Sequence, residues 1–187
     1  MKKTTLLLSL FFSMSMIAFS VLITEAKAGN REGQFSLSPV IGGITFFGKQ
    51  RLDTGPFLGI REGFNFTDNF GVEALFDYGR IHSAIGATNV DFFRYGADML
   101  YHFRPGSSLV PYVAAGIAGI NFNAPKGIAL NGVKGSFDYG AGIKYFLTDK
   151  IAVRGDVRHL LYSHGNTLNT IEYSFGLLIP LGGEKQK

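Results

Sequence analysis

The chain between residues 92 and 103 reads Phe92-Phe93-Arg94-Tyr95-Gly96-Ala97-Asp98-Met99-Leu100-Tyr101-His102-Phe103. Its odd-numbered positions are all apolar or aromatic, whereas its even-numbered positions include an arginine, a glycine, an aspartate and a histidine. Successive side chains of a β-strand point to opposite faces, so this two-residue period predicts a strand with one apolar face and one mixed polar face. A helix would instead repeat its apolar positions every three to four residues.

The same period recurs in segments 70–79, 136–145, 151–158 and 171–179, and more weakly at about 35–46, 55–66 and 110–120, which makes eight expected strands. Short turns are expected at 67–69, 104–108 and 147–150, and longer connections near 47–54, 80–89, 121–133 and 162–169. Alternating short and long connections are typical of transmembrane barrels. We therefore predict an all-β fold, an eight-stranded antiparallel up-and-down transmembrane β-barrel with short periplasmic turns and longer extracellular loops.

The composition agrees with this fold and excludes several others. The 187 residues are 46% hydrophobic and 17% charged, which is too apolar and too weakly charged for a disordered chain. The 25 glycines and the 14% of aromatic residues favour strands and tight turns over helices. The absence of cysteine excludes disulfides, thiolate metal sites and cysteine nucleophiles.

The first residues have the pattern of an export signal. Lys2 and Lys3 precede an uncharged, mostly apolar run over residues 6–23, and Ala26-Lys27-Ala28 fits a small-x-small cleavage site. We expect residues 1–28 to be a signal peptide and residues 29–187 to form the outer-membrane barrel domain; an uncleaved N-terminal anchor is the alternative. The signal carries three lysines and one glutamate, so the net charge falls from +4 to +2 on cleavage. No Lys/Arg cluster remains, which argues against a nucleic-acid partner.

The direction in which each face points separates a membrane barrel from a soluble barrel or sandwich. The mixed polar face carries many glycines, which suit the crowded interior of an eight-stranded barrel, whereas a water-facing surface would be rich in Lys and Glu. The apolar face should therefore contact lipid and carry two aromatic girdles. The expected girdle residues are Tyr101, Phe103, Tyr112 and Tyr145 near the short turns, and Tyr78, Phe93, Phe137 and Tyr173 near the long loops.

Several short segments together carry a family resemblance. In chain order they are Gly55-Pro56-Phe57-Leu58-Gly59, Gly63-Phe64-Asn65-Phe66-Thr67-Asp68-Asn69, Val72-Glu73-Ala74, Val110-Pro111-Tyr112-Val113-Ala114-Ala115-Gly116, Tyr139-Gly140-Ala141-Gly142-Ile143-Lys144-Tyr145-Phe146 and Arg154-Gly155-Asp156-Val157-Arg158. Their order and spacing resemble the outer membrane protein A-like (OmpA-like) eight-stranded barrels of Gram-negative bacteria. The resemblance covers nearly all of residues 29–187. It implies a monomer in the cell outer membrane, in contact with outer-membrane lipid and lipopolysaccharide.

The last strand resembles that family's assembly signal. The residues that carry this resemblance are Tyr173, Gly176, Leu177, Ile179 and Leu181. The likeness implies that the barrel-assembly machinery is a partner during insertion. Leu181 stands where the family usually ends in an aromatic residue, and residues 182–187 follow it. The long loops at the cell surface could present a site for an extracellular ligand.

The expected lumen face carries charges of both signs. It includes six acids and four bases, namely Glu73, Asp77, Arg94, Asp98, Asp138, Lys144, Arg154, Asp156, Arg158 and Glu172. Buried charges must be paired or hydrated, so these residues are predicted to form a salt-bridge network that plugs the barrel; a charged constriction in a small gated pore is the alternative. Arg158 and Glu172 should lie opposite each other in the last hairpin. If Arg61 points inward, Glu62 points to lipid, which a bulge or an interfacial depth would have to explain.

Patterns for catalysis, metals or cofactors are sparse. Ser163-His164, near Glu172, is the one Ser–His neighbourhood with an acid, but adjacent strand residues point to opposite faces and the pair falls in an expected loop. His82 and His102 lack the spacing of metal ligands, and His159 is expected to face outward. We therefore expect no catalytic residues, no metal and no cofactor.

The function predicted from the sequence is that of a non-enzymatic integral outer-membrane β-barrel protein, with a role in envelope structure or surface interaction. A small or gated porin-like pore for ions or small solutes is the first alternative. A lipid A-modifying outer-membrane enzyme is a more distant alternative. It is considered because some eight-stranded barrels of this kind are lipid A deacylases with a Ser/His pair.

Overall fold

The computed structural model describes residues 29–47, 53–82, 89–123, 132–163 and 167–182. Eight strands follow one another along the chain. They are β1 (Gln34–Phe46), β2 (Gly55–Asn65), β3 (Phe70–His82), β4 (Asn89–His102), β5 (Leu109–Asn123), β6 (Gly132–Thr148), β7 (Ile151–Ser163) and β8 (Thr167–Gly182). The expected signal peptide, residues 1–28, lies outside the described residues.

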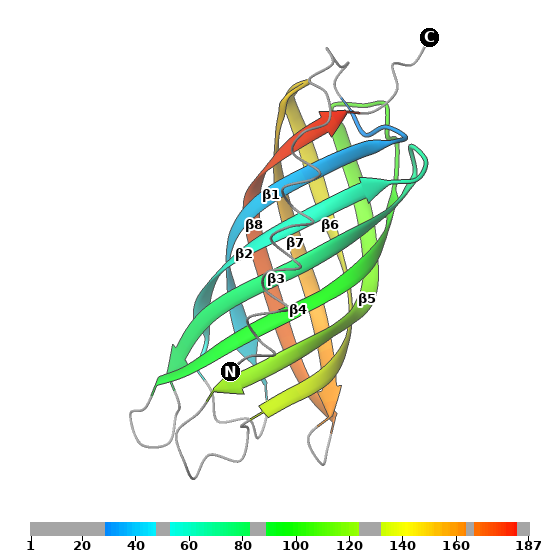
Figure 1. The fold of residues 1–187 in the computed structure, drawn as a ribbon. Helices are drawn as coiled ribbons and strands as arrows, with labels where there is room; N and C mark the ends of the chain where they lie inside the picture. The colour runs from blue at the N-terminus through cyan, green and yellow to red at the C-terminus, as the bar shows by residue number, and fades with distance from the viewer. Residues whose placement is uncertain (1–28, 48–52, 83–88, 124–131, 164–166, 183–187) are drawn as a thin grey trace, which may run out of the picture.

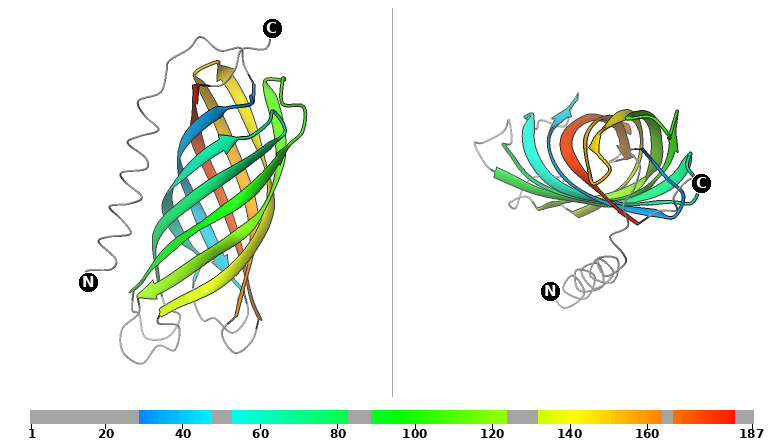
Figure 2. Two further views of the ribbon diagram at one scale, coloured as in Figure 1. Left: turned by 45° about the vertical axis from the view of Figure 1, so that its right-hand side comes forward. Right: turned by 90° about the horizontal axis from the view of Figure 1, so that it is seen from above.

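Each strand pairs in antiparallel orientation with its sequence neighbour, and β1 also pairs with β8, which closes the sheet into a barrel. The strands are steeply tilted in Figure 1, and the view from above in Figure 2 shows them as one ring. The predicted eight-stranded antiparallel barrel is therefore confirmed. Within the described part of the chain, no helix is long and apolar enough to cross a membrane.

The connections alternate between the two ends of the barrel. Residues 66–69, 103–108 and 149–150 form the periplasmic turns, at the top of Figure 1. At the other end the strands run further than their sequence pattern predicts, so that only residues 164–166 separate β7 from β8. The pattern fades there because outward positions such as Arg80 and His159 are polar, and the alternation of apolar with polar residues is lost.

The outward face of the barrel is apolar and the inward face is packed with polar residues. Ile117, Leu58 and Met99 point outward and are each more than 60% exposed, whereas Arg94 and Asp138 point inward and are fully buried. This arrangement reverses that of a soluble protein and is the one expected for a barrel in a lipid bilayer. The sequence-based choice of which face contacts lipid was therefore correct for these strands.

Seven of the eight expected girdle residues do lie on the outward face, and Tyr112 does not. Tyr112 is 1% exposed and points into the lumen, where its ring lies over Gly142 of the neighbouring strand; a Cβ atom at Gly142 would come within 2.5 Å of that ring. The placement predicted for Tyr112 was wrong because both faces of β5 are apolar at this point, so residue type alone does not indicate the face.

Glu62 points outward, as expected once Arg61 points inward. The pairing of β2 is unbroken here, with Glu62 opposite Leu37 of β1 and Ala74 of β3, so no bulge explains its direction. Glu62 lies three residues before the periplasmic end of β2 at Asn65. Its position near the membrane interface is therefore the explanation that the structure supports.

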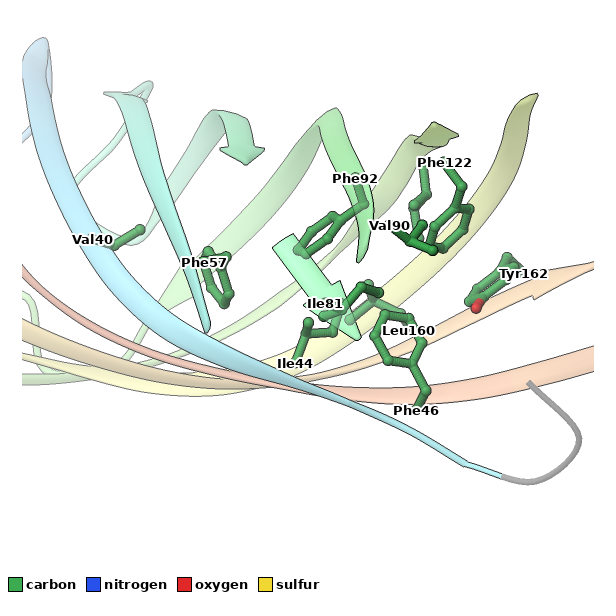
Figure 3. Packing of buried hydrophobic residues seen from close by; sticks show 11 residues of the cluster. Val40, Ile44, Phe46, Phe57, Ile81, Val90, Phe92, Phe122, Leu160 and Tyr162 are labelled. Carbon is green, nitrogen blue, oxygen red and sulfur yellow. The ribbon is translucent and has the colours of Figure 1, made fainter. Parts of the chain in front are cut away.

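An apolar cluster fills the part of the lumen next to the extracellular end of the barrel. Its members come from six strands: Val40, Ile44, Phe46, Phe57, Ile81, Val90, Phe92, Ile120, Phe122, Leu160 and Tyr162. Figure 3 shows these side chains gathered on the inner side of the strands. The rings of Phe46 and Tyr162 lie 6.2 and 6.1 Å from the ring of Phe122, between ring centroids. This layer closes the extracellular end of the lumen, and the charged residues lie on its periplasmic side.

Candidate functional site: the charged lumen

The ten charged residues expected in the lumen all point inward and are at most 5% exposed. They occupy alternate positions of β3, β4, β6, β7 and β8, so the two-residue period of each strand places them on one surface. Because eight strands enclose a space only wide enough for side chains, residues on opposite walls come within contact distance. The contacts therefore join residues that are far apart in the sequence.

Arg94 is the centre of one group of ion pairs. Its guanidinium nitrogens lie 2.7 Å from Glu172, 2.8 Å from Asp138 and 3.2 Å from Asp77. Arg61 completes the group, with Nη2 3.0 Å from Glu172 and 3.2 Å from Asp77. Two guanidinium groups thus share two carboxylates across the lumen, and such charge-assisted hydrogen bonds fix their geometry.

Arg154 and Arg158 form a second group around Glu73. Arg154 donates to both carboxylate oxygens of Glu73, at 2.5 and 3.1 Å, and Arg158 Nη2 lies 3.0 Å from Glu73 Oε1. Arg154 also pairs with Asp156 at 2.9 Å, and Arg158 lies against Asp98. Every carboxylate of this group therefore contacts a guanidinium.

Two residues connect the parts of this lumen. The Asp138 carboxylate lies 2.8 Å from Arg94 and 3.6 Å from Arg158, which joins the two groups of ion pairs into one network. The Tyr112 hydroxyl accepts a hydrogen bond of 2.8 Å from Arg154 and donates to Asp156. Nine of the ten expected residues, together with Arg61 and Tyr112, therefore form one continuous network.

Lys144 does not join a carboxylate in this network. Its ammonium donates to His102 Nε2 at 2.8 Å and to Asn30 Oδ1 at 3.4 Å, and it lies 5.3 Å from the centroid of the Tyr112 ring. Asn30 belongs to the segment before β1, and the backbone amide of Asn30 donates to Pro105 O at 2.8 Å. This segment thus brings a polar partner for Lys144 to the periplasmic end of the lumen.

Three members of the site were not assigned from the sequence. Arg61 was considered only conditionally, Tyr112 was placed on the wrong face, and His102 was considered only as a metal ligand. In the strand register Arg61 lies opposite Leu75, which is on the same inward face of β3 as Asp77. Knowledge of this register would have shown that Arg61 points inward. Because no sequence signal marks contacts across the lumen, the partner of each charge could not be assigned.

The arrangement pairs opposite charges across the lumen. Six carboxylates face four guanidinium groups, and an unpaired buried charge is costly, so these groups hold one another in place. No cluster of three His, Asp or Glu side chains placed for a metal is found in the described ranges. The Glu172 carboxylate is bound by Arg61 and Arg94, while the Ser163 side chain and His164 lie outside the described residues. His159 faces outward and contacts Tyr139 and Asn169.

Comparisons with solved structures find the same fold. Neisserial surface protein A shares 18% identity and a TM-score of 0.63, over 79% of this chain and 99% of that one. The outer membrane protein OprG of Pseudomonas aeruginosa shares 14% identity and a TM-score of 0.59, over 83% and 99% of the two chains. The N-terminal β-barrel domain of OprF from the same species shares 22% identity and a TM-score of 0.52, over 80% and 100%.

A comparison with curated proteins gave no match. A family model described as the outer membrane protein beta-barrel domain matches residues 14–178, which is most of the chain. The apolar outward face, the charged lumen and the closed strand order agree with that description. The chain therefore belongs to the outer membrane protein beta-barrel domain family of Gram-negative outer membranes.

Proposed function

We propose that the protein is a closed, non-enzymatic barrel that serves envelope structure or surface interaction. The observation that carries this proposal is the filled lumen, where an apolar layer lies above a continuous network of paired charges. For a solute to pass, Phe46, Phe92 and Phe122 would have to leave their packed layer and the ion pairs below would have to separate. Both changes are unfavourable in an eight-stranded barrel, whose interior has room for little beyond its own side chains.

A gated pore is the competing function. The observation that favours it is the network of charged side chains in the lumen. Charged constrictions line selective pores, and the inner faces of the strands carry six carboxylates and five Arg or Lys side chains. Purified protein in planar bilayers distinguishes the two functions. A closed barrel should stay near background conductance, whereas uniform, repeated conductance steps would support the pore and overturn the closed barrel.

A lipid A-modifying activity has weaker support, because Glu172 is engaged by two arginines on the lumen side. Overexpression followed by mass spectrometry of lipid A tests it. We expect an unchanged lipid A mass. Loss or transfer of an acyl chain that depends on Ser163 or His164 would contradict the non-enzymatic proposal.

The remaining proposals concern location and partners. Cleavage after Ala28 would give a mature N-terminus at Gly29, which mass spectrometry of outer-membrane protein would detect, whereas intact residues 1–187 in the inner membrane would contradict it. Insertion would depend on the barrel-assembly machinery, and the inserted barrel would be a monomer surrounded by lipid and lipopolysaccharide. A surface-binding role predicts that trimming residues 48–52 and 124–131 abolishes attachment to a ligand while the barrel still folds.

A further inference from the structure

A groove of about 970 Å³ crosses the outer wall of β1, β8, β7, β6 and β5. Its floor is the sheet itself, and its two edges are successive rows of outward side chains. The strand register defines the first row as Ile41, Phe175, Gly155, Ile143 and Pro111, and the second as Tyr173, Val157, Ala141 and Val113. Both rows are apolar, so the groove offers a hydrocarbon-lined channel on the lipid-facing surface.

The groove runs obliquely between two depths of the membrane. Ile41 lies midway along β1, whereas Pro111 is the third residue of β5, beside the periplasmic turn 103–108. Phe103, in that turn, lines the groove at its periplasmic end. The groove therefore leads from the middle of the bilayer to the periplasmic interface, which is the path of an acyl chain whose headgroup lies in the inner leaflet.

Two small outward residues, one in each row, widen the groove. Gly155 has no side chain, and a Cβ atom built there would meet nothing closer than a backbone oxygen at 3.8 Å. Ala141 lies near it in the second row. Most other outward positions of the wall carry Leu, Ile, Val, Phe or Tyr, so the wall is hollowed at a place where it could have been filled.

Arg104 lies in the turn at the periplasmic end of the groove. Arg104 follows Phe103 directly, is exposed, and has a φ of 51°, the one positive φ among non-glycine residues of the described ranges. Such a conformation is unfavourable for a side-chain-bearing residue and persists only where surrounding contacts hold it. Here the Arg104 carbonyl accepts hydrogen bonds from the Ser107 amide at 3.1 Å and from the Ser107 hydroxyl at 2.9 Å.

A second cation and one acid lie in the adjoining turn. The turn 103–108 is bound to the end of β6 by the Phe146 amide, which donates to Ser108 O at 2.8 Å. Lys150 is exposed in the next turn, 149–150, beside Asp149. A phosphate at Arg104 would therefore lie on the same periplasmic rim as Lys150 and Asp149.

We propose that this groove binds one phospholipid of the periplasmic leaflet, with an acyl chain between the two rows and its phosphate at Arg104. The apolar rows supply the affinity for the chain, since burying hydrocarbon is favourable in proportion to its area. The guanidinium of Arg104 supplies the preference for a phosphate, to which it can donate two hydrogen bonds. The site makes the barrel a holder of a specific lipid as well as a surface for bulk lipid.

Native mass spectrometry of the purified full chain with added phosphatidylglycerol tests the proposal. The native protein should retain one phosphatidylglycerol molecule, and Gly155→Phe, which fills the groove, should weaken retention about tenfold or more. Gly135→Phe is the matched control, because Gly135 also faces outward on β6 with open space around it but lies outside the groove. Ala141→Leu provides a second filling variant should Gly155→Phe fail to fold.

The headgroup contact is tested separately. Arg104→Gln should weaken retention of phosphatidylglycerol severalfold but leave retention of diacylglycerol, which has no phosphate, unchanged. Arg80→Gln at the opposite rim should alter neither. Equal retention by the Gly155→Phe, Ala141→Leu and Gly135→Phe proteins would overturn the groove as the site. Retention of lipopolysaccharide in place of the phospholipid would overturn the assignment to the periplasmic leaflet.

Discussion

Arg158 and Glu172 lie directly opposite each other on β7 and β8, yet the charge of each is bound by residues of other strands. Arg158 Nη2 lies 3.0 Å from Glu73, and the Glu172 carboxylate lies 2.7 Å from Arg94 and 3.0 Å from Arg61. The side chains reach past their nearest neighbours because the opposite wall is equally close. The network therefore links the whole circumference of the barrel and not single hairpins.

Glu172→Gln should lower the free energy of unfolding by about 3–5 kcal/mol, because it leaves two buried guanidinium groups with one charged partner fewer. Reversible urea unfolding of the barrel in lipid vesicles measures this loss. Asp91→Asn is the matched control, since Asp91 pairs with the exposed Arg80 at 2.7 Å and such pairs contribute about 1 kcal/mol or less. Unchanged stability of the Glu172→Gln barrel, with an ion-selective conductance, would favour the gated pore.

Truncating one side chain of the apolar layer should destabilise the barrel without opening the lumen. Phe122→Ala leaves a cavity among Phe46 and Tyr162 and should cost about 3–5 kcal/mol of folding free energy. Conductance should stay near background because the charged layer below remains intact. Phe137→Ala, on the lipid-facing side, should cost less because acyl chains refill the space. Steady conductance in the Phe122→Ala barrel would show that the apolar layer alone closes the lumen.

The depth of the membrane can be read along β5. Ile117 lies in the middle of this strand and is 70% exposed to the outside, so Ile117→Arg should destabilise the barrel by about 2–4 kcal/mol. Asn123 ends the same strand on its exposed side, and Asn123→Arg should cost about 0–1 kcal/mol. Unfolding in vesicles measures both. Equal costs would contradict the membrane position assigned to β5.

His102 should be a neutral imidazole with its proton on Nδ1. The Lys144 ammonium can only donate, so His102 Nε2, 2.8 Å away, must accept, and Nδ1 is then free to donate to Asn69 O at 3.2 Å. The ¹⁵N chemical shifts of a labelled sample at neutral pH distinguish this tautomer. Lys144→Met should leave the proton on Nδ1, because Asn69 O can only accept a hydrogen bond, and should shift only the Nε2 signal. A proton on Nε2 in the native barrel would contradict the contact.

The strands could be predicted from the sequence because each carries its own two-residue pattern, and the closeness of Arg158 and Glu172 followed from counting along one hairpin. The ion pairs could not, since they depend on the distance across the lumen, which no local pattern encodes. Tyr112 was misplaced for a local reason, namely that β5 is apolar on both faces there. Lys144 was grouped with the other charges although its partners, His102 and Asn30, come from the end of β4 and from the segment before β1.

The closing pair of strands has a consequence for how the chain could be rearranged. Gln34 at the start of β1 is paired with Gly182 at the end of β8, so the two ends of the barrel domain meet at the periplasmic rim. A short linker could join them, and new termini could then be opened in an extracellular connection such as 124–131. Such a circular permutant would keep every ion pair of the lumen, and its folding would show whether assembly requires β8 to be the last strand made.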